Sequence, residues 1–283
     1  MRLLVCLNND LVANFALNLL WERIDHHDVS IALSKSIGPP SLPRADVFAK
    51  WGRLERSLVF DALFPSREKQ DAPRTAYRTF RQLAASKGGA APVFSNINHP
   101  EAVEYVRARR PDLIVAVRYG HIFKAPLFDI PRHGILNLHA GLLPQYRGIY
   151  CSFWAMLHKQ PDVGCTLHHV RDAGIDTGDV IEEHRNRADY DRSVMWNLAM
   201  LYHGAADMIE RAILAIEKGK ALPSIPQSTE GGAYYRYPQN EDMAQLEQQG
   251  GRLYDRQDYE TLFKFYGIDM SEELRRSFDG TTS

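Results

Sequence analysis

Apolar and polar residues alternate in blocks along this chain, and the lengths of the blocks predict strands and helices. Leu3 to Leu7 is a short apolar run, and the stretch from Leu11 to Arg23 has helical spacing. Val29 to Leu33 is the next apolar run. A strand, a helix and a strand joined by short turns predict a βαβ unit, in which the strands are parallel and the crossover is right-handed.

Further apolar runs extend this unit into a larger sheet. The continuous runs 113–117 and 135–138 are typical of strands that are buried on both faces of a parallel sheet. We therefore expect an α/β domain with a doubly wound, mainly parallel sheet, whose strands lie near residues 3, 29, 93, 113, 135 and 164.

The second half of the chain predicts fewer strands. Between residues 192 and 218 apolar side chains recur every three or four positions, which predicts a long helix with a buried stripe. The chain just after Ile181 is expected to form polar turns. We expect a short helix over 258–266 and a frayed end from Ser271 onward.

The segment 38–89 is the hardest stretch to assign. It opens with a proline-rich loop and continues with mixed helical spacing. Its local positive charge predicts a solvated helix face, with contact to substrate phosphates as the alternative. We interpret it as an insertion in a main domain over 1–220, which is followed by a small C-terminal extension over 221–283. The basic residues of the insertion are Arg67, Lys69, Arg74, Arg78, Arg81 and Lys87.

Composition and charge exclude several classes of function. The 283 residues are 45% apolar and 24% charged, as in soluble globular proteins. The formal net charge of −1 predicts no general attraction to nucleic acid or to an anionic membrane. No apolar run approaches the length of a membrane span. Cys6, Cys151 and Cys165 form neither a disulfide framework nor a CxxC zinc pair, so we expect a cytoplasmic protein.

Polar side chains follow the central strands at the predicted carboxyl edge of the sheet. Asn137 and His139 are two residues apart, so they share one face of the expected strand. The strand from residue 164 leads into the loop DAGIDTGD, which carries Asp176 between two glycines. An amide, an imidazole and a carboxylate at strand ends are the groups needed to acylate an amine. A structural role is the commoner one for a strand histidine taken alone.

Two other turns lie at the same edge of the sheet. Asn8, Asn9 and Asp10 follow the first strand and are candidate substrate contacts, but a turn with a helix cap is the favoured alternative. The segment RYGHIF follows the strand 113–117, and Gly120 within it allows the backbone to approach a ligand closely. We interpret that segment as a ligand-lining loop.

Three linked motifs occur in order between about residues 96 and 227: NHPEAVEYVRARRPDLIVAVRYG, GILNLHAGLLPQYRG and GCTLHHVRDAGIDTGDVI. Together they resemble the folate-dependent formyltransferase family. The resemblance implies a Rossmann-like formyltransferase fold, 10-formyltetrahydrofolate as the co-substrate, and Asn137, His139 and Asp176 as the catalytic residues. It also implies a pterin pocket that is lined largely by backbone groups of Gly120, His121, Ile122, Phe123, Asp172, Ala173, Gly174 and Ile175.

One position departs from the family pattern. The family usually has Ser two residues after the histidine, where this chain has Gly141. The chain therefore lacks a hydroxyl near the expected site, together with any auxiliary hydrogen bond that this hydroxyl makes elsewhere. We also predict no metal, because the adjacent His168 and His169 face opposite sides of a strand.

The segment GGAYYRYPQNEDMAQL supplies candidate contacts to the acceptor. Tyr234 and Tyr235 can stack on a base or a sugar, and Arg236 can bind a phosphate; packing against the main domain is the alternative. Arg147, in the central motif, is a further candidate for substrate binding. Members of the family that formylate nucleotide-linked amino sugars have a tyrosine-containing segment in this position. A small amine, first of all a nucleotide-linked amino sugar, is therefore the expected acceptor.

Other functions remain open from the sequence. Water in place of the amine would make the protein a 10-formyltetrahydrofolate hydrolase, and a folate-binding module without turnover is another alternative. The chain also resembles the core of the initiator-tRNA formyltransferase, but the part after Gln227 has helical patterning instead of the strands of an RNA-binding barrel. Other amine acceptors and a homodimeric assembly stay open as well.

Overall fold

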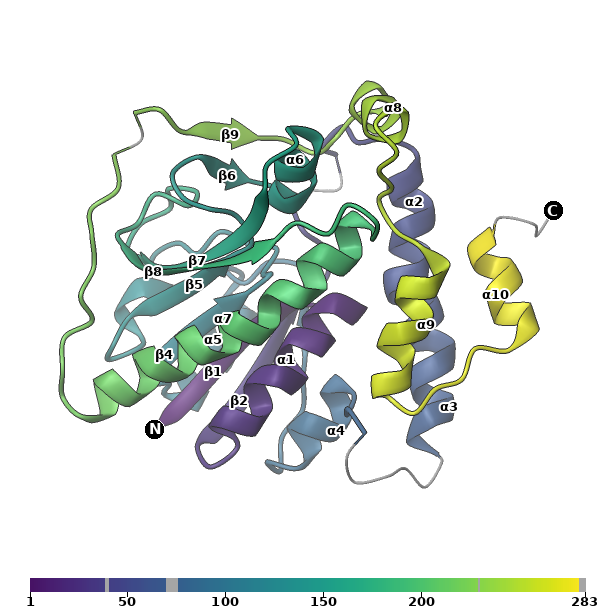
Figure 1. The fold of residues 1–283 in the computed structure, drawn as a ribbon. Helices are drawn as coiled ribbons and strands as arrows, with labels where there is room; N and C mark the ends of the chain where they lie inside the picture. Colours follow the sequence, from purple (N-terminus) through teal and green to yellow (C-terminus); the bar gives the residue numbers. More distant parts are fainter. Residues whose placement is uncertain (39–40, 70–75, 229, 280–283) are drawn as a thin grey trace.

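A seven-stranded sheet forms the centre of the structure, in the order β3-β2-β1-β4-β5-β7-β8 (Figure 1). The computed structural model describes residues 1–38, 41–69, 76–228 and 230–279. The first five strands in this order run parallel, whereas β7 is antiparallel to both β5 and β8. The predicted doubly wound, mainly parallel sheet is confirmed. The strands are β1 (Arg2–Asn8), β2 (Asp28–Ser34), β3 (Val93–Phe94), β4 (Leu113–Val117), β5 (Ile135–His139), β7 (Asp162–Val170) and β8 (Val180–Arg187).

Helices cover both faces of the sheet because the central strands are apolar on both sides. In β1, Leu3, Val5 and Leu7 belong to one buried cluster, while Leu4 and Cys6 belong to the other. The first cluster lies under α1 (Leu11–Ile24), α6 (Cys151–Leu157) and α7 (Val194–Glu217), and the second under α5 (Pro100–Arg109). Figure 1 shows α1 and α7 side by side on one face of the sheet.

Two helical segments, 41–69 and 237–279, pack on each other beside the sheet. Figure 1 shows α9 next to α2 and α3, and we call residues 41–69 and 237–279 the helical flank. Trp51 Nε1 donates a hydrogen bond of 2.8 Å to the hydroxyl of Tyr259, which joins the two segments. The helices of these segments are α2 (Val47–Gly52), the π-helical η1 (Arg53–Leu63), α3 (Phe64–Glu68), α8 (Asn240–Gln248), α9 (Arg256–Phe265) and α10 (Glu272–Asp279). A further short helix, α4 (Phe80–Ala85), precedes β3.

Three expectations for the outer parts of the chain were wrong. The polar turns after Ile181 are the edge strand β8, whose charged side chains alternate because one side faces solvent. The stretch 272–279 does not fray, since it forms α10 and buries Leu274 and Phe278; residues 280–283 lie outside the described residues. The insertion does not present its basic residues as one solvated face: Arg67 is buried and donates to the carbonyl of Tyr266, over 2.5 Å.

Three other basic residues of the insertion also have partners within the protein, whereas Lys69 is exposed. Arg81 pairs with Glu68, Lys87 donates to the carbonyl of Asp25, and Arg78 lies over the ring of Trp21. Arg74 lies outside the described residues. No helix in the described ranges is long and apolar enough to cross a membrane.

Two short strands form a second, parallel sheet above the carboxyl edge of the first. They are β6 (Tyr146–Gly148) and β9 (Ala233–Tyr235), and Arg147 pairs with Tyr234 in their register. A single turn of 3-10 helix, η2 (Leu127–Asp129), follows β4. The pairing of β6 with β9 brings the tyrosines of the C-terminal segment to the edge of the main sheet where the central strands end.

Candidate active site

Four polar side chains meet at the carboxyl end of β5. Asn137 and His139 extend from the same face of β5, and the antiparallel register places His168 of β7 directly opposite Asn137. Asp176 approaches from the loop between β7 and β8. Its Oδ1 lies 3.5 Å from Nδ1 of His139, 3.5 Å from Nδ2 of Asn137 and 3.7 Å from Nε2 of His168. The structure therefore brings the three residues predicted as catalytic together, and adds a fourth.

The loop holds Asp176 in an unusual conformation. Its φ is +54°, in the left-handed region that most residues avoid. Two contacts support this conformation: the backbone N–H of Gly148 donates to Oδ2 over 2.9 Å, and Nε2 of Gln227 donates to the carbonyl of Asp176 over 3.2 Å. The loop is thus tied both to β6 and to the segment after α7, so the position of the carboxylate depends on three parts of the chain.

Asp176 is ionised at neutral pH despite its burial. Burial raises the pKa of this carboxyl, but the charge of His139, the contact with His168 and the N–H of Gly148 together lower the pKa to about 2. A carboxylate with these partners favours a positive charge on the imidazole next to it.

His139 has an acceptor at each ring nitrogen. Nε2 lies 2.7 Å from the carbonyl oxygen of Tyr146, which can only accept, so Nε2 carries a proton. Nδ1 faces the carboxylate of Asp176. The ring can therefore take a second proton at Nδ1 and act as an acid, or remain neutral there and accept one.

His168 fixes the amide of Asn137. Nδ1 of His168 donates to the carbonyl of His169 over 2.9 Å, which leaves Nε2 as an acceptor for Nδ2 of Asn137 at 3.0 Å. The sequence reasoning assigned His168 no role in the site. The pairing of Asn137 with His168 across β5 and β7 is the feature that identifies it, and that register is not visible in either segment alone.

The cluster forms one wall of a cavity of about 580 Å³. A cavity of this size, with mainly apolar walls and a few polar groups on one side, is typical of a site for a cofactor-sized ligand. Burial lowers the pKa of His121 in its wall, so this ring is neutral at neutral pH. The residues predicted for the pterin pocket that line the cavity are Gly120, His121, Ile122, Phe123, Asp172, Gly174 and Ile175. Ala173 is not among the lining residues.

Part of the chain is similar to known formyltransferases. A family model described as formyl transferase matches residues 66–195. The methionyl-tRNA formyltransferase of Geobacter sulfurreducens is 44% identical over 85 residues, which are 30% of this chain and 26% of that protein. The enzyme of the same name from Acetivibrio thermocellus is 31% identical over 170 residues, 60% of this chain and 54% of that protein. The chain thus spans only about a quarter to a half of the curated relatives it matches.

Over residues 66–195, a little less than half of its length, the chain is thus similar to the formyl transferase family. Solved structures of formyltransferases share its fold. Glycinamide ribonucleotide transformylase 1 of Symbiobacterium toebii has a TM-score of 0.52 and 18% identity, over 81% of this chain and 94% of that one. An N-formyltransferase of Helicobacter canadensis, solved with folinic acid and dTDP-3-aminofucose, has a TM-score of 0.51 and 15% identity, over 86% and 72%.

Gly141, where this chain departs from the pattern of the family it resembles, is closely surrounded. A Cβ atom added there would lie 2.5 Å from the carbonyl oxygen of Tyr146 and 2.6 Å from Nε2 of His139. It would also lie 2.7 Å from Cβ of Cys151, whose Sγ is 3.4 Å from Nε2 of His139. The family's usual Ser therefore does not fit here without a shift of the backbone or of the imidazole.

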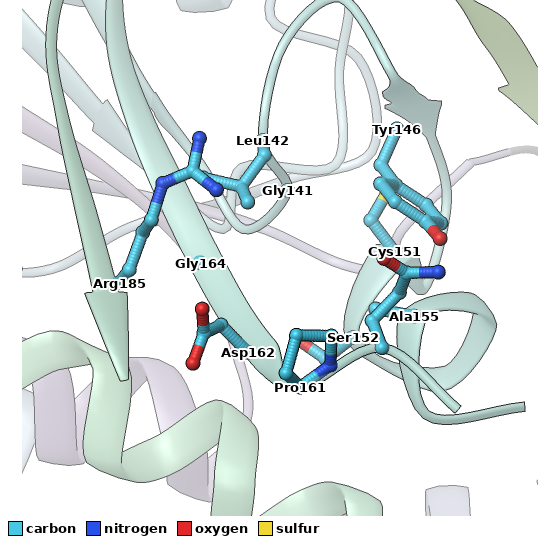
Figure 2. Close-up of a pocket in the computed structure, with 11 residues that line it drawn as sticks. Gly141, Leu142, Tyr146, Cys151, Ser152, Ala155, Pro161, Asp162, Gly164 and Arg185 are labelled. Atoms are coloured by element: carbon cyan, nitrogen blue, oxygen red, sulfur yellow. The ribbon is translucent and has the colours of Figure 1, made fainter. Parts of the chain in front are cut away.

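A smaller cavity of about 60 Å³ lies behind this point (Figure 2). Gly141 and Cys151 line it together with Asp162 and Arg185, whose side chains extend from the neighbouring strands β7 and β8. None of Asn137, His139, His168 or Asp176 lines it, so the larger cavity is the candidate active site of this protein.

The residues after β1 have partners inside the protein. Asp10 caps α1 by accepting a hydrogen bond of 2.8 Å from the N–H of Ala13, and it pairs with Arg118 at 2.9 Å. Nδ2 of Asn8 donates to Oδ2 of Asp10 over 2.5 Å, and the N–H of Asn9 donates to the carbonyl of Ser34. The turn with a helix cap, which was the favoured alternative, is what these contacts show. Neither Asn8, Asn9 nor Asp10 lines the large cavity.

The predicted acceptor residues of the C-terminal segment divide into two groups. Tyr234 lines the large cavity, and 52% of its surface is exposed. Tyr235 instead stacks on Tyr146 at 5.1 Å, and Arg236 donates to Asp242 over 2.6 Å, so packing accounts for both. Arg147 does not line the cavity; its Nε is buried and has no hydrogen-bond partner among the described residues.

Three groups that can ligate a metal gather far from the site. The ligand atoms of His26, His27 and Glu217 lie within 4.8 Å of one another, between the turn after α1 and the end of α7. Nδ1 of His27 is 3.5 Å from Oε1 of Glu217, so a polar contact between the two side chains also accounts for their proximity. The prediction that this protein holds no metal stays a prediction.

Proposed function

We propose that the protein transfers the formyl group of 10-formyltetrahydrofolate to a primary amine. The observation that carries this proposal is the meeting of Asn137, His139 and Asp176 at one wall of a cavity of about 580 Å³, within a chain that is similar to the formyl transferase family. An amide N–H, an imidazole with two proton positions and an ionised carboxylate match the needs of acyl transfer through a tetrahedral oxyanion.

Asn137 stabilises the oxyanion in this proposal. Its amide has two N–H groups: His168 accepts one of them, and the second is held in a fixed direction on the side of Oδ1 of Asp176, 3.5 Å from Nδ2. The nitrogen of the neutral amine attacks the formyl carbon, and the carbonyl oxygen becomes the oxyanion. One donor of this kind is typically worth about 100- to 1000-fold in rate.

His139 and Asp176 handle the proton. The attacking amine loses a proton as the C–N bond forms, and N10 of the folate gains one as the old C–N bond breaks. His139 is the carrier, with Nδ1 as the site that changes protonation, because Nε2 is held by the carbonyl of Tyr146. Asp176 orients the ring and stabilises its charged form.

The donor and the acceptor occupy different parts of the cavity in this proposal. The pterin lies against 120–123 and 172–175, where Ile122 and Ile175 are exposed apolar side chains. The acceptor lies toward Tyr234, and a nucleotide-linked amino sugar remains the first choice, since Tyr234 offers an exposed ring for stacking. We further propose that the catalytic domain is 1–220, that 221–283 is an extension, and that the protein acts in the cytoplasm, where its free cysteines stay reduced.

An acceptor screen tests the proposal. The protein is incubated with 10-formyltetrahydrofolate and single amines, including amino sugars linked to nucleotides and initiator methionyl-tRNA, and tetrahydrofolate and formate are measured. Formation of tetrahydrofolate and a formamide with one amine is the expected result. Formate without any amine identifies a hydrolase, and folate binding without turnover identifies a binding module; either result overturns the proposal.

Two variants test whether the activity found in the screen depends on the catalytic cluster. Asn137→Ala is expected to lose about 100- to 1000-fold in turnover while it still binds folinic acid. Asn186→Ala, on the edge strand β8 away from the cavity, is the matched control. Equal losses in both variants would show that the effect is not local to the cluster.

A further inference from the structure

Three side chains that can ligate a metal meet away from the candidate active site, and we call them the peripheral cluster. His26 and His27 lie in the turn between α1 and β2, and Glu217 is the last residue of α7. One ligand atom of each lies within 4.8 Å of the others. None of the three lines the large cavity, so the peripheral cluster is separate from the residues proposed to transfer the formyl group.

The turn brings two adjacent histidines to the same side of the backbone. In a strand, neighbouring side chains point to opposite faces, which is why His168 and His169 predict no metal. That argument does not apply to His26 and His27, because they lie in a turn. Their ring centroids are 3.9 Å apart, with 45° between the ring planes. Both imidazoles can therefore reach one ion.

The distance between His27 and Glu217 also fits a shared ion. Nδ1 of His27 is 3.5 Å from Oε1 of Glu217. Two ligand atoms that each lie about 2.1 Å from one tetrahedral zinc ion are about 3.4 Å apart. The ring of His27 is buried and is held in place by its surroundings, whereas the side chain of His26 is exposed and can rotate to close on an ion.

The electrostatic surroundings of the peripheral cluster favour a cation. α1 and α7 both end there, and the carboxyl end of a helix carries partial negative charge that attracts cations. Two cationic groups of the chain already lie nearby: the amino group of Met1 is 3.4 Å from Nδ1 of His27 and 3.8 Å from Oε1 of Glu217, and Lys87 donates to the carbonyl of Asp25. A metal ion would compete with the amino group for the same two atoms.

We propose that the peripheral cluster binds a divalent transition-metal ion such as Zn²⁺, with His26, His27 and Glu217 as ligands. Two imidazoles and one carboxylate are a donor set that zinc accepts in proteins, whereas Mg²⁺ prefers oxygen ligands. Three protein ligands leave the fourth position to water. The ion would join the turn after α1 to the end of α7, so its role is to tie together two segments that are far apart in the sequence.

Titration of the full-length protein with Zn²⁺ tests the proposal. The protein is treated with a chelator and dialysed, and zinc binding is then measured by calorimetry, with and without saturating folinic acid. We expect binding with the same affinity in both titrations, because the peripheral cluster lies away from the large cavity. Absence of zinc binding would overturn the proposal and leave the polar contact between His27 and Glu217 as the explanation. An affinity that changes with folinic acid would assign the ion to the large cavity and would also overturn it.

Variants at the two exposed ligands locate the site without changing the buried ring of His27. Loss of a group that only supports a metal ligand typically costs about 10- to 100-fold in affinity, so His26→Ala and Glu217→Ala, which each remove a ligand, should weaken zinc binding by about 100-fold or more. His203→Ala, which changes an exposed histidine of α7 outside the cluster, is the matched control. Native affinity in either ligand variant, or an equal loss in His203→Ala, would overturn the three-ligand site.

Thermal unfolding gives a second readout, which does not require that the protein be an enzyme. An ion that binds the folded chain and not the unfolded one raises the midpoint of unfolding. Zinc should raise the midpoint of the native protein and of His203→Ala, and should leave that of His26→Ala unchanged. An equal rise in all three proteins contradicts the site. Absence of formyl transfer with every amine would contradict the proposed function and would leave the zinc results as they are.

Discussion

The catalytic cluster and the helical flank each bury a carboxyl group, and the pKa values of the two groups are shifted in opposite directions. Asp176 has its pKa lowered to about 2, because His139, His168 and the N–H of Gly148 outweigh the effect of burial. Glu55, in the flank, has its pKa raised to about 7, because burial and Asp10 outweigh Arg118 and Tyr259. The carboxyl groups of Asp176 and Glu55 are buried to a similar extent, so the charged and hydrogen-bonding groups around each of them decide which one is ionised.

The two regions also contribute to stability with opposite dependence on pH. Since the folded pKa of Asp176 is lowered from 3.8, its contribution is present above about pH 4 and is lost as the pH falls toward 2. Since the folded pKa of Glu55 is raised from 4.5, its contribution is present below about pH 4.5 and is lost as the pH rises through 7. An ionised carboxylate is suited to catalysis in the site, and a carboxyl group that is only partly ionised is suited to the packed interface of the flank.

The largest expected effect is in the catalytic cluster. Asp176→Asn removes the charge that orients His139 and stabilises its protonated form, so turnover should fall by about 100- to 10,000-fold while folinic acid still binds. Steady-state kinetics and calorimetry measure the two quantities. Asp179→Asn, three residues along and paired with Arg171 on the surface, is the control. Near-native turnover in Asp176→Asn would show that Asp176 takes no part in catalysis.

The next largest effect is on the pH dependence of the free energy of unfolding, to which Glu55 in the helical flank contributes. In the native protein, the free energy of unfolding should lose up to about 3 kcal/mol through Glu55 between pH 4.5 and pH 8. Glu55→Gln keeps a side-chain acceptor for the hydroxyl of Tyr259 but cannot ionise, so this loss should vanish. Urea unfolding at several pH values, native against variant, gives the difference. Parallel curves for the two proteins would mean that Glu55 is ionised throughout.

The contact that joins the two parts of the flank has a smaller effect. Tyr259→Phe removes a hydroxyl that accepts from Trp51 and donates to Glu55 over 2.5 Å, both of which are buried. Loss of these bonds should lower the free energy of unfolding by about 1–3 kcal/mol. Thermal or urea unfolding at pH 7 measures it. Tyr254→Phe, half-buried on the same segment, is the control, and equal stability of all three proteins would contradict the contact.

The smallest expected effect is that of a substitution at His168, in the catalytic cluster. His168→Ala leaves Asn137 without its acceptor, so the amide can rotate, and kcat should fall by about tenfold with little change in KM. His168→Gln, which offers an oxygen as acceptor, should recover part of the loss. His169→Ala, whose ring faces the other side of β7, is the control. A loss in KM alone, or an equal loss in His169→Ala, would show that His168 does not position Asn137.

The comparison of the catalytic cluster with the helical flank also explains which parts of the fold could be predicted from the sequence. The strands near residues 3, 29, 113 and 135 were predictable because each is a continuous apolar run buried on both faces. The edge strand β8 was missed because its apolar positions are few and its charged residues face solvent. The flank could not be predicted, since Glu55 and Tyr259 are 204 residues apart in the sequence.

The candidate site divides in the same way. Asn137, His139 and Asp176 lie in motifs that can be read from short segments, and the structure brings them together. The place of His168 depends on the register between β5 and β7, which only tertiary structure supplies. Tyr235 and Arg236 were predicted as acceptor contacts because aromatic and basic residues suit both binding and packing, and Tyr146 and Asp242 occupy them instead.

One measurement tests the central claim most directly. The native protein and His139→Ala are each given 10-formyltetrahydrofolate with an isotope-labelled formyl group and the amine found by the acceptor screen, and the label is followed by nuclear magnetic resonance. The label should move to a formamide with the native protein, and at most at about a hundredth of that rate with His139→Ala, which should still bind folinic acid. Transfer at equal rates by the two proteins would contradict the account.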